Sequence, residues 1–442
     1  MSSLNDSEIR ENEERSIVRD SFTEKIGLPK GTPWGIVATT IFVVGDALEV
    51  TWISNFFSSD IGIALSQAAW IITVFGIVTA VASYAVGPLV MVMGPRKVMF
   101  LGFIGWIVAD ILFIAVALPT QSYWLILLTY ALRGVGTPLF AFAFVTWLNA
   151  RAAAGREART QAWFWFCISG GQQIIGAAIA ATLLPVVGPI HTLWVGLGIA
   201  IIGGLIGVTL VRDPEEAKVQ PTSNSLAESF GAAVSIVWRE PRVGVGAIVK
   251  LINIAGIFAM MVFYVPYLTT EIGIPVGNAV LTFTILGITG VPGNLVWGWL
   301  SDRLGWANTI QWVASPINAI AIALLYFVPQ WIGPNFVAIA ALMLFWGIGT
   351  SAYVPLSALV PALVAKKEQP AALGTVTLAT GVGQLIGPAI VAGLLPMLGF
   401  QGVAWTVVGM YVLSLLLMFY VQLPGRARTT ASISPERVEV SP

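Results

Sequence analysis

Residues 170–188 read GGQQIIGAAIAATLLPVVG, and residues 381–399 read GVGQLIGPAIVAGLLPMLG. The two stretches are identical at eleven of 19 positions, whereas ordinary residue frequencies would give about two identities. The same offset of 211 residues pairs Trp194 with Trp405 and Gly87 with Gly298. The chain therefore consists of two related copies of about 200 residues each, and we expect two structurally similar halves.

The composition is that of a membrane protein. Of the 442 residues, 57% are hydrophobic and only 10% are charged, and the mean hydropathy is +0.85. Soluble proteins have about 25% charged residues. The net charge of zero comes without a basic patch between aromatic residues, which argues against a nucleic-acid partner. Because Cys167 is the single cysteine, an internal disulfide is excluded. The hydrophobic composition makes the lipid bilayer the expected surrounding.

Twelve apolar runs are long enough to cross a bilayer, which takes about 20 residues. The polar residues 212–243 separate six runs from the other six, and residues 229–238 within them have the pattern of an amphipathic surface helix. We expect an all-α integral membrane protein with 12 transmembrane helices in two pseudo-symmetric six-helix bundles, 33–211 and 244–423. Polar tails at 1–32 and 424–442 flank them. The runs are 33–57, 66–92, 98–118, 121–148, 161–186, 190–211, 244–269, 277–300, 308–329, 335–360, 370–395 and 402–423.

The basic residues predict the orientation. Twenty of the 22 Lys and Arg lie in the tails or in the even-numbered loops between runs. Because cytoplasmic segments are enriched in positive charge, both termini are expected in the cytoplasm, with the chain crossing the plasma (inner) membrane many times. The two exceptions are Arg133 in the fourth run and Lys250 in the seventh.

Ionisable residues in the apolar runs mark the first candidate site. Asp46 and Glu49 lie three residues apart in the first run, and the repeat has Ile257 and Met260 at their places. Arg133 precedes the stretch Gly134–Val–Gly136–Thr137, and in the second copy the aromatic Trp346 precedes the similar stretch Gly347–Ile–Gly349–Thr350. A buried charge is costly and needs a partner, and an Asp/Glu pair near an Arg can bind and release a proton. We expect proton coupling through these three residues. Asp110 in the third run is expected to make a structural hydrogen bond.

A second candidate site is formed by amides and aromatic rings in the apolar runs. Amides donate and accept hydrogen bonds, and rings offer flat apolar faces, a mixture that suits a small polyhydroxylated ligand. Contacts between helices are the alternative role for each amide. Two of the amides, Gln173 and Gln384, recur in both copies. The candidates for substrate binding are Trp52, Asn55, Gln172, Gln173, Asn253, Tyr264, Trp346, Tyr353 and Gln384.

The eighth run ends in a motif with the pattern G-x-L-x-D-R-x-G, formed by Gly298, Leu300, Asp302, Arg303 and Gly305. This pattern resembles the loop motif of the major facilitator superfamily. The resemblance implies a conformational gate in which glycines pack closely and the Asp and Arg latch to neighbouring helix ends. It also implies that the first and fourth helices of each half line a central cavity. The first-half counterpart keeps Gly94 and Arg96 but has Met91 where Asp is usual.

The first run carries a narrower resemblance. Its residues Gly45–Asp46–Ala47–Leu48–Glu49–Val50–Thr51–Trp52–Ile53–Ser54 are similar to G-D-x-x-E-x-x-W-L-S, a pattern of the polyol permease family, with Ile53 in place of Leu. This family includes ribitol and arabinitol transporters. The resemblance implies proton symport of sugar alcohols.

We therefore expect a secondary active transporter that imports a sugar alcohol, or a similar small polyhydroxy solute, together with protons by alternating access. Uptake of an organic anion such as a dicarboxylate, with Arg133 or Lys250 meeting its carboxylate, is the first alternative. Efflux of a drug or metabolite ranks below it, and a receptor or scaffold stays open. One His and one Cys cannot form a metal cluster, so we expect no enzyme activity, no metal and no cofactor. The protein is expected to work as a monomer.

Overall fold

The computed structural model describes residues 28, 32–149, 151, 157–210, 235–365 and 368–421. The expected tails at 1–32 and 424–442 lie almost entirely outside these residues. So does most of the central polar stretch, although residues 235–239 form a helical turn that contains part of the expected amphipathic helix. The described chain is helical, and nine of its helices are long and apolar enough to cross a membrane.

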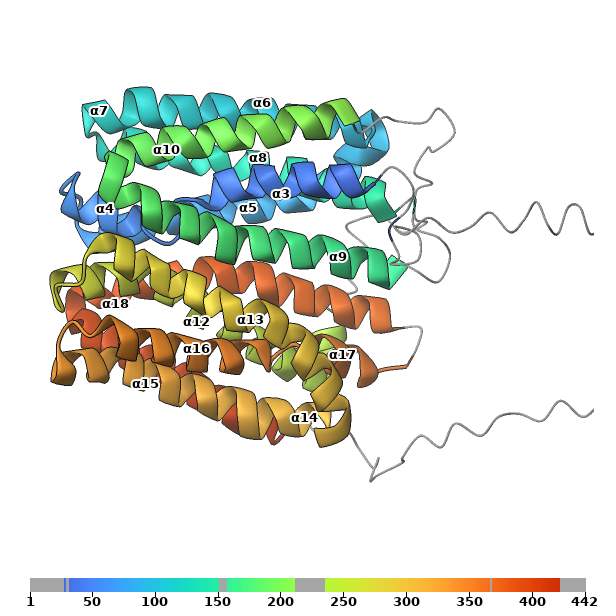
Figure 1. Cartoon of the computed structure of the whole chain (residues 1–442). Helices are drawn as coiled ribbons and strands as arrows, with labels where there is room; N and C mark the ends of the chain where they lie inside the picture. Colours follow the sequence, from blue (N-terminus) through green and yellow to red (C-terminus); the bar gives the residue numbers. More distant parts are fainter. Residues whose placement is uncertain are drawn as a thin grey trace, which may run out of the picture.

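The helices of each half follow one another along the chain (Figure 1). The first half contains α3 (Pro33–Ala47), α4 (Ile53–Ser59), α5 (Leu65–Met93), α6 (Pro95–Leu112), η1 (Phe113–Ala117), α7 (Leu118–Thr120), α8 (Tyr123–Asn149), α9 (Glu157–Gly170), η2 (Gly171–Gly176) and α10 (Ala177–Leu210). The second half contains α12 (Pro241–Thr270), α13 (Val276–Leu304), α14 (Trp306–Thr309), η3 (Ile310–Ala314), α15 (Ser315–Ile332), α16 (Phe336–Ser351), α17 (Leu356–Ala362) and α18 (Gln369–Met418).

These elements make the twelve predicted spans. Two of the nine long helices, Thr160–Leu210 and Ala371–Met418, each contain a sharp kink and supply two spans. The short helices α3 and α4 together supply the remaining span. Proline in the first turn starts α3, α6 and α12, where its missing N–H has no helical partner to lose.

Glycines with positive φ show the repeat in the backbone itself. Gly188 and Gly399 form the two kinks, with φ of 77° and 63°. Gly94 and Gly305, with φ of 80° and 87°, end α5 and α13 in the same way. Both pairs are separated by the 211 residues of the sequence repeat. A side chain is disfavoured at such φ values, so glycine fixes the same turns in both halves.

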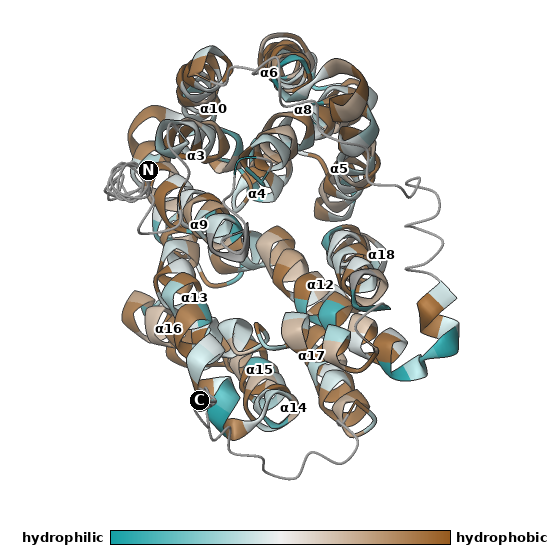
Figure 2. Cartoon of the chain, turned by 90° about the vertical axis from the view of Figure 1, so that its right-hand side faces the viewer, coloured by the Kyte–Doolittle hydropathy of each residue, from teal (hydrophilic) through white to brown (hydrophobic). Residues whose placement is uncertain are grey.

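The two halves lie side by side, with α3–α10 in one group of helices and α12–α18 in the other (Figure 2). We call the end of the bundle near residues 32, 151, 235 and 421 the proximal end, which faces the viewer in Figure 2. The opposite end, with the turns at residues 60–64 and 271–275, is the distal end. Large apolar side chains such as Val92, Val186 and Met397 are 79% or more exposed, as expected for helices surrounded by lipid.

Packing between the halves is concentrated toward the distal end. The larger apolar core joins first-half residues from 48–71, 113–130 and 180–193 to the second half. Ser54 Oγ donates to the Val262 carbonyl at 2.6 Å, and Thr269 Oγ1 donates to Asn55 Oδ1 at 2.7 Å. A smaller apolar core belongs to the first half alone. The two halves are thus closed against each other at the distal end.

Two predicted continuous spans are broken. The first span unwinds at residues 48–52, between α3 and α4, and the tenth unwinds at residues 352–355, between α16 and α17. In the first break, Val50 and Trp52 donate to carbonyls three residues back instead of four. The Trp52 ring N–H satisfies one freed carbonyl, that of Leu48, at 2.7 Å. Glu49 therefore lies within an irregular segment and not on a regular helix face.

Candidate functional site

Arg133 is held where three first-half helices approach closely. It lies on α8 beside Gly134 and Gly136. A Cβ at Gly136 would lie 2.3 Å from the Trp106 Cβ on α6, and one at Gly134 would lie 2.8 Å from the Phe75 carbonyl on α5. The two glycines let α8 press between α6 and α5. This packing brings Arg133, only 2% exposed, against acidic residues from other helices.

The guanidinium of Arg133 meets two carboxyl groups. Its Nη1 donates a hydrogen bond to Glu49 Oε1 from the break in the first span. Its Nε lies 2.8 Å from Asp110 Oδ1 on α6, an ion-pair distance. The Nε–H does not point at that oxygen, so neither atom has a hydrogen bond to any described residue. Glu49 and Asp110 are 4% and 2% exposed. Arg133 therefore bridges two buried acids, one by a hydrogen bond and one by charge alone.

Asp46 lies beside Arg133 and its two acidic partners, and its hydrogen bond goes to a different residue. Its Oδ1 accepts a hydrogen bond of 2.7 Å from the Trp106 ring N–H, and its side chain is only half-buried. Of the two acids expected near Arg133, Asp46 and Glu49, the structure pairs Glu49 with the guanidinium, and it adds Asp110 as a second partner. The structural hydrogen bond expected of Asp110 is replaced by the ion pair, because the close approach of α6 and α8 brings Asp110 to Arg133.

Aromatic rings surround the guanidinium. Its central carbon lies 5.3 Å from the ring centre of Trp106, 5.4 Å from Phe113 and 5.1 Å from Tyr130. Such rings attract a cation through their faces and exclude water. Three acids and one base thus lie close together, and the rings shield the guanidinium from water. We call Asp46, Glu49, Asp110 and Arg133 the acid cluster. Among the described residues, no three His, Cys, Asp or Glu side chains are arranged to hold a metal ion.

A cavity of about 220 Å³ lies between the two halves and reaches the acid cluster at Asp46. The first half supplies most of its wall, and α12 and α18 supply the rest. The part of the wall that the structure describes contains amides, hydroxyls and rings, one acid, and no Lys, Arg or His. Its polar and aromatic side chains are Asp46, Thr79, Tyr130, Thr137, Gln172, Gln384, Phe75, Phe142, Phe164, Trp165 and Phe258.

Three of the nine predicted substrate residues lie at this cavity or directly beside it. Gln172 and Gln384 line it from opposite halves. Gln173 lines an adjoining space of about 10 Å³, together with Gln172 and Thr51. That space is the size of one water molecule. The Thr51 hydroxyl, in the break of the first span, is buried without a hydrogen bond to any described residue.

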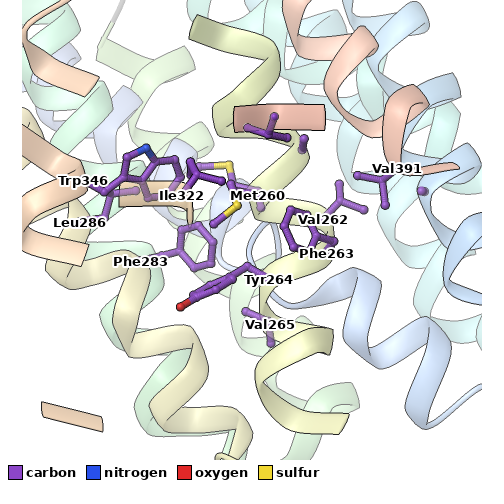
Figure 3. Close-up of a cluster of buried hydrophobic side chains, with 14 of the residues drawn as sticks. Met260, Val262, Phe263, Tyr264, Val265, Phe283, Leu286, Ile322, Trp346 and Val391 are labelled. Carbon is purple, nitrogen blue, oxygen red and sulfur yellow. The ribbon is translucent and has the colours of Figure 1, made fainter. Parts of the chain in front are cut away.

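The other six predicted substrate residues are buried in contacts between helices. The Trp52 ring N–H donates to the Leu48 carbonyl at the end of α3, and Asn55 accepts a hydrogen bond from Thr269 of the other half. Tyr264 donates to the Leu325 carbonyl at 3.2 Å and lies with Trp346 in the apolar packing of the second half (Figure 3). Trp346 donates to Asn318 at 2.9 Å, Tyr353 bonds Ser315 and Ser414, and Asn253 has a buried side-chain oxygen without a bond to any described residue.

The predicted gating residues lie at the proximal end. Asp302 accepts a bond of 2.8 Å from the Trp306 ring N–H, and Arg303 lies 4.0 Å from the centre of the Trp299 ring. In the first half, Arg96 donates to the Val208 carbonyl at 3.2 Å. Gly94 and Gly305 form the positive-φ turns, and a Cβ at Gly298 would meet open space. The contacts of Asp302 and Arg96 join neighbouring helices within each half, whereas Arg303 and Trp299 both lie on α13.

Sequence reasoning missed three residues of this region. Trp106, Tyr130 and Thr137 surround the acid cluster or line the cavity. Tryptophan and tyrosine are common in membrane helices, so composition gives no signal for them. The spacing does: Tyr130 and Thr137 lie three before and four after Arg133, on the same face of α8.

Twelve helices in two repeated halves, with a polar cavity between them, define a membrane transporter fold. The family model described as "Major Facilitator Superfamily" matches residues 35–356 and 318–442. The chain belongs to the major facilitator superfamily, and it is a transporter of that superfamily. The predicted fold class is confirmed.

Curated relatives cover nearly the whole chain. An alpha-ketoglutarate permease of Bacillus subtilis (strain 168) is 33% identical over 89% of this chain and 89% of its own length. A D-arabinitol transporter of Klebsiella pneumoniae is 28% identical over 94% of this chain and 98% of its own length. A ribitol transporter of the same organism is 28% identical over 90% and 94%. The resemblance to the polyol permeases is thereby confirmed.

Solved structures share the fold. The crystal structure of the nucleoside transporter NupG covers 89% of this chain and 99% of its own, with a TM-score of 0.72 and 14% identity. The crystal structure of a D-xylose-proton symporter covers 88% and 96%, with a TM-score of 0.65 and 15% identity.

Proposed function

We propose that this protein imports a sugar alcohol, or a similar small polyhydroxy solute, together with protons. One observation carries the proposal: Asp46 lies in the cavity wall and also beside Arg133 and its acidic partners. A solute in the cavity and a proton on the acid cluster are therefore close enough to influence each other. The D-arabinitol and ribitol transporters among the relatives support this substrate class.

The cavity wall favours a neutral solute. Gln172, Gln384, Thr79 and Thr137 present hydrogen-bonding groups from different helices. Hydroxyl groups of a polyol donate and accept at once and match both amides and hydroxyls. Rings such as Phe75 and Trp165 pack against the C–H faces of such a solute. Among the described residues the wall offers an anion no basic side chain, whereas Asp46 would repel it when ionised.

The charges of the acid cluster support proton coupling. Three carboxyl groups share one guanidinium, so full ionisation leaves an excess of two negative charges in a buried place. Such an excess is unfavourable where water is scarce, and like charges in one site do not all ionise. The cluster therefore holds a proton, and Asp46 is our choice for the residue that exchanges it with the cavity.

Uptake of an organic anion is the second candidate, because the alpha-ketoglutarate permease is 33% identical. In that case a carboxylate needs a cation, and Lys250 on α12 is the basic residue of the second half nearest to the membrane interior in sequence. Arg133 is less suited to this role, since Glu49 and Asp110 already occupy it.

Transport into membrane vesicles tests both candidates. We expect a panel of labelled polyols and dicarboxylates to show uptake of a polyol that rises when the outside is made acidic and falls when the gradient is collapsed. Accumulation of a dicarboxylate and of none of the polyols would replace the first candidate by the second. Polyol uptake that ignores the proton gradient would leave facilitated diffusion.

We further propose that the termini are cytoplasmic, that the membrane is the plasma membrane, that the protein works as a monomer and that it has no enzymatic activity. The positive charges of the proximal loops support the orientation. The proximal end then faces the cytoplasm, and the distal closure corresponds to an inward-facing arrangement.

A further inference from the structure

Asp110 differs from the other acids of the cluster in what stabilises its charge. Glu49 receives an N–H from Arg133, and Asp46 receives the ring N–H of Trp106. Asp110 Oδ1 receives no hydrogen bond from any described residue, although Arg133 Nε lies 2.8 Å away. Donors to a carboxylate favour its ionised form. Of the three acids, Asp110 is the one whose ionised form has the fewest donors.

The surroundings of Asp110 also isolate it. Its side chain is 2% exposed and is not part of the cavity wall, which reaches the cluster at Asp46. The charged groups that face it are Arg133 on α8, Glu49 in the break of the first span and Asp46 on α3. The other helices packed on α6 are α5 and α10, which carry Tyr84 and His191 as their titratable side chains.

One guanidinium neutralises one carboxylate, which leaves two acids to be accounted for. Glu49 is the hydrogen-bonded partner of Arg133, and Asp46 faces the cavity. If Asp46 releases its proton while Asp110 is also ionised, the buried cluster carries two uncompensated charges. If Asp110 keeps a proton, the excess is one charge, and it lies on the residue that the cavity reaches.

We propose that Asp110 is a second proton-holding residue of the transport cycle, which stays protonated while Asp46 binds and releases the coupled proton. Asp110 thus adds no negative charge to the acid cluster, so that Arg133 neutralises Glu49 and Asp46 alone exchanges its proton with the cavity. The proposal rests on the proton symport proposed above. It also gives α6 a role, since the second copy has Ala321 at the same offset.

Infrared spectroscopy tests the protonation directly. A protonated carboxyl has a C=O band that ionised, exposed acids lack. In the Asp46→Asn variant, measured near neutral pH, we expect one protonated-carboxyl band, and we expect the added substitution Asp110→Asn to remove it. Absence of the band in Asp46→Asn, or its persistence in the double variant, would overturn the proposal. If the double variant does not assemble, the band in Asp46→Asn alone decides.

The pH profile of uptake gives a second readout of the charge on Asp110. Asp110→Asn replaces an acid by a neutral side chain of the same shape. Because a protonated Asp110 is already neutral, the substitution removes no charge, and the midpoint of the pH profile should stay at the wild-type pH. Asp60→Asn, which neutralises an exposed acid at the distal end, is the control and should keep the wild-type midpoint.

A midpoint that moves in an assembled Asp110→Asn protein shows that Asp110 is ionised in the unaltered protein and contradicts the proposal. The two hypotheses fail separately. Uptake that ignores the proton gradient in the unaltered protein refutes the symport, whereas the infrared band reports on Asp110 whatever drives transport.

Discussion

Asp46 is the single acid of the described cavity wall, and it is tied to the interior by the bond from Trp106. Asp46→Asn keeps the shape of the side chain and removes its ionisation. We expect accumulation against a gradient to be abolished, while exchange of labelled for unlabelled solute continues. Vesicle uptake with and without a proton gradient measures the first, and counterflow measures the second. Proton-driven accumulation by Asp46→Asn would exclude Asp46 as the carrier.

Gln172 and Gln384 face the cavity from different halves. A bound hydroxyl that loses its partner costs about 1–3 kcal/mol, so alanine at either position should weaken binding about 5- to 150-fold at 25 °C. Binding isotherms of the purified protein measure this. Asn318→Ala serves as a control of the same chemistry, because Asn318 is bonded to Trp346 outside the cavity wall. Equal loss in the control, or no loss in both glutamine variants, contradicts this site.

The amide and aromatic candidates show where residue types fail as a guide. The sequence predicted that nine of these residues bind the solute, but only three of the nine line the cavity or its adjoining space. The amides at the cavity and those between helices have the same chemistry and a similar apolar sequence around them. Only the packing of other helices determines that Gln384 faces the cavity, whereas Asn55 is bonded to Thr269.

At the scale of the elements, Gly136 decides whether the acid cluster forms. An alanine Cβ there would lie 2.3 Å from the Trp106 Cβ, which forces α6 away from α8. Overpacking of this kind costs about 1–3 kcal/mol. We expect Gly136→Ala to lower the thermal unfolding temperature in detergent and to reduce driven uptake, because Asp110 and Trp106 then move away from Arg133 and Asp46.

Gly105 on α6 provides the matched control. A Cβ at Gly105 would meet no atom within 4 Å, so Gly105→Ala should leave unfolding unchanged or stabilise the helix by up to about 1 kcal/mol. Equal unfolding temperatures for the two variants would show that the approach of α6 and α8 is looser than described.

The helices themselves were largely predictable, and their interruptions were not. Runs of apolar residues predicted each span within a few residues, since crossing a bilayer requires such a run. The unwound segments at residues 48–52 and 352–355 have the same apolar character as regular helix. The ring N–H of Trp52 and the contacts of Ser54 with the other half stabilise the first break, and these contacts exist only after folding.

For the whole molecule, alternating access requires the distal contacts to open. Thr269 and Asn55 meet across the halves through a hydrogen bond of 2.7 Å. In a background where Cys167 is replaced by Ser, a disulfide between Asn55→Cys and Thr269→Cys should stop transport, and reduction should restore it. Each single cysteine variant is the control. Full transport by the oxidised double variant would mean that this end does not open.

The sequence repeat predicted that the whole chain forms two similar halves. The positive-φ glycines at equivalent positions of the two halves confirm this prediction. The partners of Arg133 were less accessible. Asp46 and Glu49 were singled out because they are ionisable residues in an apolar run and the repeat has apolar residues at their places, whereas Asp110 was expected only to make a structural hydrogen bond. Which acid meets the guanidinium depends on the break in the first span and on the glycines of α8, and neither is expressed in the spacing of charged residues.

The charges of the acid cluster all belong to one half, and the other half contributes neutral contacts to the cavity such as Gln384 and Phe258. The two copies thus differ in charge, and the proton coupling proposed above involves the acids of the first copy alone. We expect substitutions in the second copy to change which solute is bound without altering the acid cluster. Related proteins built this way are expected to differ in substrate mainly through substitutions in residues 244–423. A chimera of this first half with the second half of a relative is therefore a practical way to change the substrate.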